Sequence, residues 1–115
     1  MNNFAQSMLN QVRLLGRLCH APNLYLTQGK LLKAAFQIAV PRSPGQNGSN
    51  MITNWHTVQA DYITVVLFGQ PARELCARRL SRGVWINVQG RLRTRSRRKW
   101  EVVAHFVEPT QANKS

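Results

Sequence analysis

Hydrophobic and polar positions alternate along much of this chain, and the alternation predicts a protein built mainly of β-strands. Between Leu9 and Cys19 the even-numbered positions from 12 to 18 are apolar or glycine, with arginines at positions 13 and 17. A period of two residues with one apolar face is typical of a strand that buries one side. By the same criterion, further strands are predicted over residues 32–40, 62–68, about 84–95 and 100–107.

The strand over residues 62–68 differs from the others because both of its faces are apolar or aromatic. Val65 and Leu67 share one side, whereas Tyr62 and Phe68 stand on the other. Strands that are apolar on both faces are usually covered on both. We therefore expect something to lie against each face of this strand.

The segments between the strands contain residues typical of turns and of one helix. Residues 41–60 are rich in Pro, Gly, Ser and Asn near their start, which predicts a long loop or a protruding hairpin. Pro71 at a first helical position, apolar residues at helical spacing up to Leu80, and Gly83 beyond them predict a helix over about 71–81. Turns are expected around 21–23, 27–30 and 96–99.

The resulting order of elements is strand, strand, long loop, strand, helix, strand, strand. A helix between the third and fourth of five strands is the layout of an OB-fold barrel. The sequence therefore predicts an all-β fold, a five-stranded OB-fold barrel with one short helix between strands 3 and 4.

The charge of the chain is strongly positive and unevenly distributed. Sixteen Lys and Arg residues stand against four Asp and Glu residues, which gives a net charge of +12. The region from 73 to 99 is densely basic, and its one acid is Glu74. Because most of this block falls in a predicted strand, it does not resemble the charged face of a membrane-surface helix. The backbone of a nucleic acid is therefore the predicted partner.

Other classes of protein find little support. At 43% hydrophobic residues the chain is foldable, and it has neither an apolar run of 18 residues nor a signal peptide. We expect a cytoplasmic, nucleoid-associated protein without membrane contact, in which Cys19 and Cys76 are reduced. The carboxylates and the three histidines show no catalytic or metal-ligand spacing. The prediction is a binding protein, not an enzyme, with no cofactor and no metal.

Three motifs carry a resemblance to a known family. They are MLNQVRLLGRL at 8–18, VVLFG at 65–69 and GRLRTR at 90–95. They resemble the first, third and fourth strands of bacterial single-stranded DNA-binding proteins (SSB), and the resemblance covers residues 8–108. It implies an OB-fold domain over 8–109, an N-terminal extension over 1–7 and a short polar tail over 110–115. It also implies a homotetramer or homodimer that binds and protects single-stranded DNA in replication, repair or recombination.

The resemblance further implies roles for individual residues. Tyr62 and Phe68 match positions that stack on bases, and their even separation puts both on one side of a strand. The family's other stacking positions hold no aromatic residue here, so Trp55 and Trp100 are candidates to compensate. The expected contacts to the DNA backbone are Arg13, Arg17, Lys33, Arg91, Arg93, Arg95 and Arg97.

Alternative interpretations remain open. The chain ends without the acidic tip by which family members recruit other proteins, and in this it resembles the primosomal PriB-type proteins. It would then be an adaptor that binds single strands together with a replication or restart protein. An RNA-binding OB-fold protein is a third alternative.

The residues themselves also allow a purely structural interpretation. The arginines from 91 to 97 would then form a solvated hairpin face, Tyr62 and Phe68 would pack between subunits, and Trp85 would be structural. Since like charges two residues apart repel and few acids are available to pair them, we favour contact with a polyanion.

Overall fold

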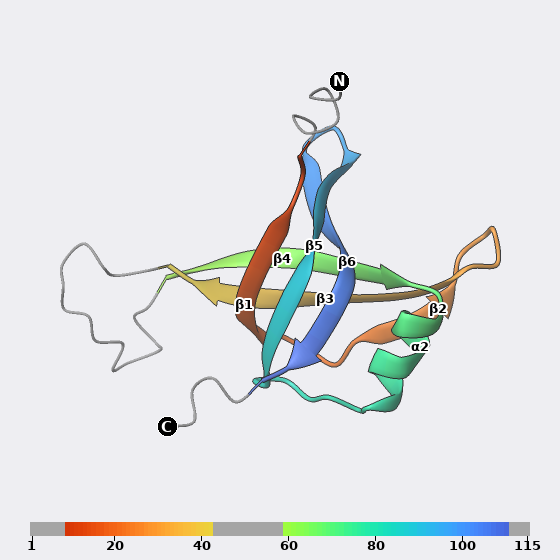
Figure 1. Cartoon of the computed structure of the whole chain (residues 1–115), viewed down its shortest axis with the longest axis horizontal. Coiled ribbons are helices and arrows are strands. Elements are labelled where there is room, and N and C mark those ends of the chain that lie inside the picture. Colours follow the sequence, from red (N-terminus) through yellow and green to blue (C-terminus); the bar gives the residue numbers. More distant parts are fainter. Residues whose placement is uncertain (1–8, 43–58, 111–115) are drawn as a thin grey trace, which may run out of the picture.

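The computed structural model describes residues 9–42 and 59–110, which contain six strands and one helix (Figure 1). They are, in chain order, β1 (Val12–Leu18), β2 (Asn23–Leu26), β3 (Leu32–Pro41), β4 (Ala60–Phe68), α2 (Gln70–Ala77), β5 (Trp85–Ser96) and β6 (Lys99–Pro109). The five strands predicted from alternation are confirmed. In the described part of the chain, no helix has the length and apolar character needed to cross a membrane.

Five of the strands close into a barrel, and β2 lies outside it. The hydrogen-bonded order is β1-β5-β6-β4-β3-β2, and β1 also pairs with β3, which joins the two ends of the five-stranded ring. The pairing of β4 with β6 is parallel, and the other pairings are antiparallel. A closed ring leaves its members without a free edge. With α2 between the third and fourth strands of the ring, this is the predicted OB-fold barrel (Figure 1).

The core lies where the predicted inward-facing positions meet. Ile38, Val65 and Ile86 are 0% exposed, and Leu75 of α2 belongs to the same cluster. Removing each such side chain from water contributes about 1.5–3 kcal/mol to folding. The apolar face seen in the alternation is therefore the face that holds the barrel together.

A β-bulge in β6 decides which of its residues face the core. Val88 lies opposite Val107, but Gly90 lies opposite Ala104, so His105 is an extra residue on β6. An extra residue shifts the alternation by one. Val107 and Ala104 consequently both pack against the core although their numbers differ in parity.

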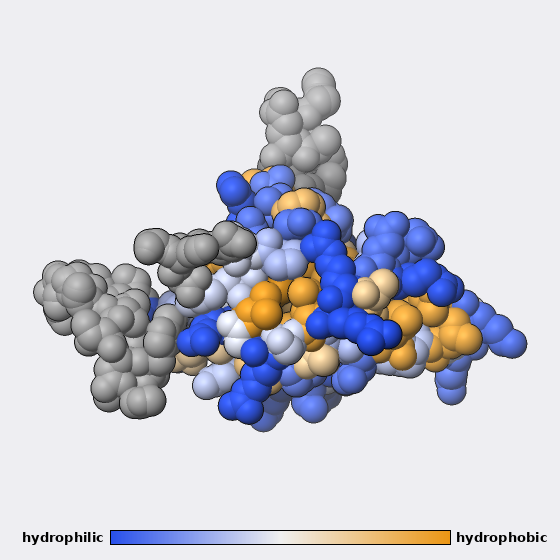
Figure 2. All heavy atoms as spheres, turned by 90° about the horizontal axis from the view of Figure 1, so that it is seen from below, coloured by the Kyte–Doolittle hydropathy of each residue, from blue (hydrophilic) through white to orange (hydrophobic). Residues whose placement is uncertain are grey.

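Strand β2 is an element that the sequence did not predict. It has only four residues, all exposed, and it pairs with β3 alone. A strand this short and fully exposed shows no alternation between buried and exposed positions, so the periodicity of the sequence does not reveal it. Leu24 and Leu26 remain 39% and 60% exposed, and Figure 2 shows apolar surface at the end of the molecule where β2 and α2 lie.

The helix is shorter than predicted, because α2 ends at Ala77 and not near 81. Arg79 has a φ of 54°, a left-handed conformation that cannot continue a right-handed helix. Leu80 still packs against the core from beyond the helix. The helical spacing of apolar residues therefore predicted the burial of Leu80 correctly, but it placed the end of the helix too late in the chain.

The hairpin of β5 and β6 extends beyond the barrel, with its tip at 97–98 as expected. β5 pairs with β1 only as far as Gly90. The side chain of Asn10 then continues the pairing: its Nδ2 donates to the carbonyl of Leu92 and its Oδ1 accepts from the same residue's N–H, both at 2.8 Å. Leu92 is 39% exposed, because the core does not reach this far along β5.

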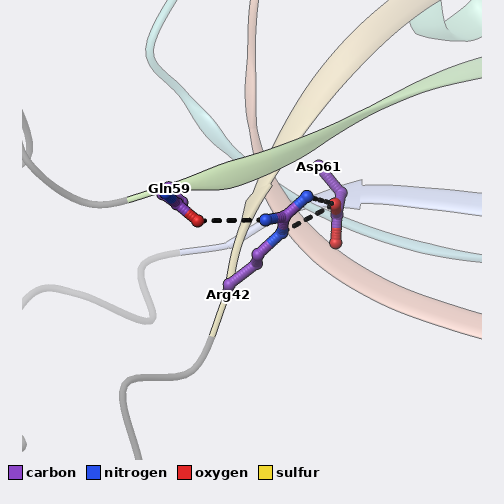
Figure 3. Close-up of polar contacts among 3 residues, drawn as sticks. All are labelled: Arg42, Gln59 and Asp61. Carbon is purple, nitrogen blue, oxygen red and sulfur yellow. Dashed lines mark hydrogen bonds and ion pairs between the residues drawn. The ribbon is translucent and has the colours of Figure 1, made fainter.

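An arginine ties together the adjoining ends of β3 and β4 (Figure 3). The Nε of Arg42 donates to Oδ1 of Asp61 at 2.9 Å, and its Nη1 donates to Oε1 of Gln59 at 3.0 Å. The backbone N–H of Arg42 also donates to the carbonyl of Gln59 at 2.9 Å. These bonds link the two strand ends at the point where residues 43–58, part of the loop predicted over 41–60, leave the described part of the chain. Pro41 and Ala60, the ends of that predicted loop, belong instead to β3 and β4, because they pair with each other across the two strands.

Candidate nucleic-acid interface

The outer face of the β3–β4 pair carries both aromatic residues that were predicted to stack on bases. The register pairs Lys33 with Phe68 at one end and Ala39 with Tyr62 at the other, with Gln37 opposite Thr64 between them. Tyr62 and Phe68 therefore share one side of β4, as their spacing predicted. Six residues of strand separate them by about 20 Å.

Cations and aromatic rings alternate across the strands around Phe68. Lys33 lies between two rings, with its Nζ 5.8 Å from the centre of Tyr25 on β2 and 5.7 Å from the centre of Phe68. On the other side, Cζ of Arg93 lies 5.7 Å from the centre of Phe68. Cations at such distances are attracted to the ring faces by about 0.5–1 kcal/mol. We call Tyr25, Lys33, Phe68 and Arg93 the Phe68 cluster.

A buried carboxylate holds Arg93 in this cluster. Glu101 lies opposite Arg93 in the β5–β6 register, and it is only 2% exposed. Nε of Arg93 donates to Oε2 of Glu101 at 3.0 Å, and Nη2 donates to the same oxygen. The Arg93 side chain keeps 37% of its surface exposed. The Arg93 side chain is therefore held in place by the buried Glu101 and is still partly exposed to solvent.

The other end of the face forms a hollow around Tyr62. Its lining includes Arg17, Gln37, Ala39, Tyr62 and Arg82. Nε of Arg17 points toward the carbonyl of Gly83 at 3.4 Å, and its Cζ lies 5.7 Å from the centre of the Trp85 ring. Tyr62 itself is 65% exposed. An exposed aromatic ring is thus flanked by two arginines from distant parts of the sequence.

A second hollow adjoins the one around Tyr62. It is lined by His20, Asn23, Ala35, Gln37 and Thr64, and it shares Gln37 with the hollow around Tyr62. Ala35 is the neighbour of Lys33 on the outer side of β3, so this hollow leads toward the Phe68 cluster. We call this outer face of β3 and β4 the groove: it has an aromatic residue and cations at each end, and between them lie Ala35, Gln37, Thr64 and the buried Val66.

The comparison with protein families agrees with this arrangement. Residues 9–108 match the model of the single-strand binding protein family. The chain belongs to this family. The predicted resemblance, which covered residues 8–108, is confirmed.

Individual relatives carry consistent names. The chain is 36% identical over 89 residues to the single-stranded DNA-binding protein of Oceanobacillus iheyensis, covering 77% of this chain and 50% of the relative. It is 35% identical over 118 residues to single-stranded DNA-binding protein 2 of Listeria monocytogenes, covering 92% of this chain and 68% of the relative. With the single-stranded DNA-binding protein of Staphylococcus aureus it shares 33% identity over 118 residues, 92% of this chain and 70% of that protein. The chain spans about half the length of the first of these relatives.

Only some of the predicted contact residues of this family member lie in the groove. Lys33, Phe68 and Arg93 lie together at one end, and Arg17 and Tyr62 line the same hollow at the other. The remaining predicted residues lie outside these two groups or outside the described residues, and are Arg13, Arg91, Arg95, Arg97, Trp100 and Trp55.

The predicted row of four arginines on β5 is interrupted in the structure. Arg91 and Arg93 share the outer face, opposite Val103 and Glu101. The register shifts between Thr94 and Ser96, which puts Arg95 at an irregularity, and Arg97 lies in the turn beyond the strand. The alternation therefore failed at the hairpin end because a bulge breaks the period of two.

Three of the predicted residues lie elsewhere. Arg13 stands beside Leu15 on the outer side of β1, where β5 and not β4 is the neighbour. Trp100 lies opposite Thr94 on the projecting hairpin and is 59% exposed. Trp55 falls outside the described residues.

Tyr25, Arg82 and Glu101 belong to the site but were not among the residues predicted from the sequence. Tyr25 was overlooked because β2 was not predicted, and Arg82 because it follows the helix in a turn. Glu101 was treated as an isolated acid, since nothing local links it to Arg93. A cation opposite an acid across the predicted 96–99 hairpin was the one available signal for the Arg93–Glu101 pair.

Cys19 lies in the lining of the hollow around Tyr62. Burial raises the pKa of the Cys19 thiol above its ordinary value, and the charge of Arg82 partly opposes this effect. Burial likewise raises the pKa of Cys76 on α2. Both cysteines are free thiols, and the raised pKa keeps them protonated at neutral pH.

Proposed function

We propose that this chain binds single-stranded DNA along the outer face of β3 and β4, without reading its sequence. The observation that carries the proposal is the groove itself, in which two aromatic rings about 20 Å apart, the exposed Tyr62 and the half-buried Phe68, each lie beside cations. Membership of the single-strand binding protein family and the names of the relatives support it. These names do not favour the PriB-type adaptor as an alternative.

Two physical terms supply the affinity. Each unpaired base has a π-face that stacks on Tyr62 or Phe68, a contact worth about 1–3 kcal/mol. Phosphates that contact Arg17, Lys33 or Arg82 release condensed counterions, which makes binding depend on salt. Because every base has a π-face and every nucleotide a phosphate, neither term distinguishes one sequence from another.

The same groove disfavours duplex DNA. In a duplex the bases stack on one another and have no free face for Tyr62 or Phe68. Among the described residues the one helix, α2, has eight residues and packs Ala72 and Leu75 into the core, so it is not a free recognition helix of the kind that enters the major groove. Discrimination between single and double strands follows from the stacking term.

We further propose that the protein works as a homodimer or homotetramer that protects single strands on the chromosome in replication, repair or recombination. Leu15 supports the assembly, because it is 40% exposed on the outer side of β1 beside Arg13 and Asn87. An apolar side chain in such a position gains by contact with another subunit. Nucleoid association and contacts with replication proteins follow from the same role.

Fluorescence anisotropy with labelled oligonucleotides tests the function. At physiological salt, oligo-dT should bind tightly and a duplex of the same length weakly, with Tyr62→Ala narrowing the difference. An equal affinity for both would contradict the proposal. A parallel titration with oligo-U decides between DNA and RNA, because only RNA presents a 2′-hydroxyl to the groove.

A further inference from the structure

Glu101 is unusual for its position in a strongly basic protein. Among the described residues it is the one buried charged side chain, 2% exposed, and it lies under the face proposed to bind a polyanion. A buried carboxylate near bound phosphates repels them, so its presence at this place requires a compensating role. The contacts of Glu101 indicate what that role is.

The two cations beside Phe68 differ in how they are held. Both lie 5.7 Å from the centre of the ring. Arg93 gives two of its N–H groups, on Nε and Nη2, to one oxygen of Glu101, whereas Lys33 has no carboxylate partner among the residues that the structure describes. Lys33 is therefore a movable cation, and Arg93 is a neutralised and immobilised one.

We propose that Glu101 is a positioning residue of the DNA interface: it holds the guanidinium of Arg93 over Phe68 as a stacking surface for a base and withdraws Arg93 from phosphate contact. This inference rests on the proposed function, since it concerns the same groove. The base beside Phe68 then contacts Arg93 and the ring together, while Lys33 is the cation left to meet the phosphate at this end of the groove.

The physical reason lies in the charge and shape of the pair. A guanidinium is planar and stacks on aromatic faces and on bases. Paired with Glu101 it carries no net charge, so a base can lie against it without displacing a counterion from the DNA. The neutral pair does not attract phosphates, so the backbone of the strand lies toward Lys33 while a base faces Phe68 and Arg93.

Salt-dependent titration of oligo-dT separates this role from ordinary phosphate contact. Arg93→Gln should weaken binding about 5- to 50-fold at every salt concentration and leave the slope of log affinity against log salt unchanged. Lys33→Gln, which changes the other cation beside Phe68 and the one without a carboxylate partner among the described residues, is the matched control and should lower the slope by about 0.7. An equal loss of slope in both variants would overturn the inference.

Two conservative variants test the positioning directly. Arg93→Lys keeps the charge and the ion pair but lacks the planar group. It should therefore lose about as much affinity as Arg93→Gln, again at constant slope, and wild-type affinity would contradict the role of the planar group.

Glu101→Gln frees the charge of Arg93 and should raise the slope by about 0.7. In an Arg93→Gln background the same change should leave the slope unaltered, and a change of slope there would show that Glu101 acts without Arg93.

A readout independent of affinity separates the inference from the function. In heteronuclear NMR spectra, the Nε–H of Arg93 should exchange slowly with water in the free protein, stay slow when oligo-dT is saturating, and become fast in Glu101→Gln with the fold intact by circular dichroism. A wild-type protein that fails to bind oligo-dT would refute the proposed function. A protein that binds while the Nε–H of Arg93 loses its protection would refute only the positioning by Glu101.

Discussion

Tyr62 and Phe68 occupy different surroundings although they share a face of β4. Tyr62 is the most exposed aromatic residue in the described part of the chain, at 65%, whereas Phe68 is half-buried between Lys33 and Arg93. Loss of the Tyr62 ring removes little packing. Loss of the Phe68 ring also removes the contacts that Lys33 and Arg93 make with it. Tyr62 therefore gives the cleaner measure of stacking.

Tyr62→Ala should weaken oligo-dT binding by about 1–3 kcal/mol and leave the salt slope nearly unchanged, because stacking displaces water and no counterions. Phe68→Ala should do the same with an added loss of thermal stability. Anisotropy titrations over a salt series, with melting curves as a control for folding, measure both effects. Binding equal to that of wild type would mean that the rings serve packing only.

Cys19 offers a label inside the groove, and Cys76 a control outside it. Both thiols have a raised pKa, so alkylation is slow at neutral pH and speeds up as the pH rises through that pKa. At about pH 9, saturating oligo-dT should slow the alkylation of Cys19 severalfold and leave that of Cys76 unchanged. Mass spectrometry of the two tryptic peptides reports both rates. Equal protection of the two cysteines would indicate a bound path that does not follow the groove.

At the scale of elements, the β5–β6 hairpin links the barrel to the face proposed to bind DNA. Its inner part is packed so closely that a side chain at Gly90 would meet the carbonyl oxygen of Val103 at 2.2 Å. Immediately beyond, the bulge at His105 restores the inward direction of Val107. The close approach and the bulge together set the register that brings Glu101 opposite Arg93.

Gly90→Ala should destabilise the fold by about 1–3 kcal/mol or more, because backbone atoms have to move to admit the new Cβ. Gly29→Ala is the matched control, since its Cβ would meet nothing closer than Thr27 Oγ1 at 3.9 Å. Thermal unfolding followed by circular dichroism should show a clear drop in Tm for the first variant and almost none for the second. Similar Tm values for both variants would contradict the close approach at Gly90.

At the scale of the whole molecule, the groove and the proposed assembly surface adjoin along β1. The groove follows β3 and β4 and takes in Arg17 of β1, whereas Leu15 lies two residues before Arg17 on the same outer side, opposite Asn87 of β5. Leu15 itself lines neither hollow of the groove, so a substitution there tests assembly without removing a groove residue. In the proposed homodimer or homotetramer, one particle would carry more than one groove and so cover a longer stretch of single strand.

Light scattering should give a mass of two or four copies of the 13.1 kDa chain. Leu15→Lys should shift this mass toward the monomer, because it places a charge where an apolar contact is expected. Leu26→Lys, the same substitution at an exposed leucine of β2, should leave the mass unchanged. A wild-type monomer at high micromolar concentration would refute the assembly.

The sequence by itself determined what depends on neighbouring residues. A period of two fixed the strands and their inward faces, and the even spacing of Tyr62 and Phe68 put both rings on one side of β4. The excess of Lys and Arg over acids indicated a polyanionic partner. These features were accessible because the alternation of a strand and the net charge are local or additive properties.

Only the tertiary structure decided which residues meet. Closure of the barrel brings Arg17 to Tyr62 and Arg93 to Phe68, and the register of the β5–β6 hairpin buries Glu101 beneath Arg93. β2 forms because its backbone can pair with β3, and α2 ends just before Arg79, which adopts a left-handed conformation. Pairing across strands depends on bulges and on closure, which residues far apart in the chain determine together, so no local pattern encodes it.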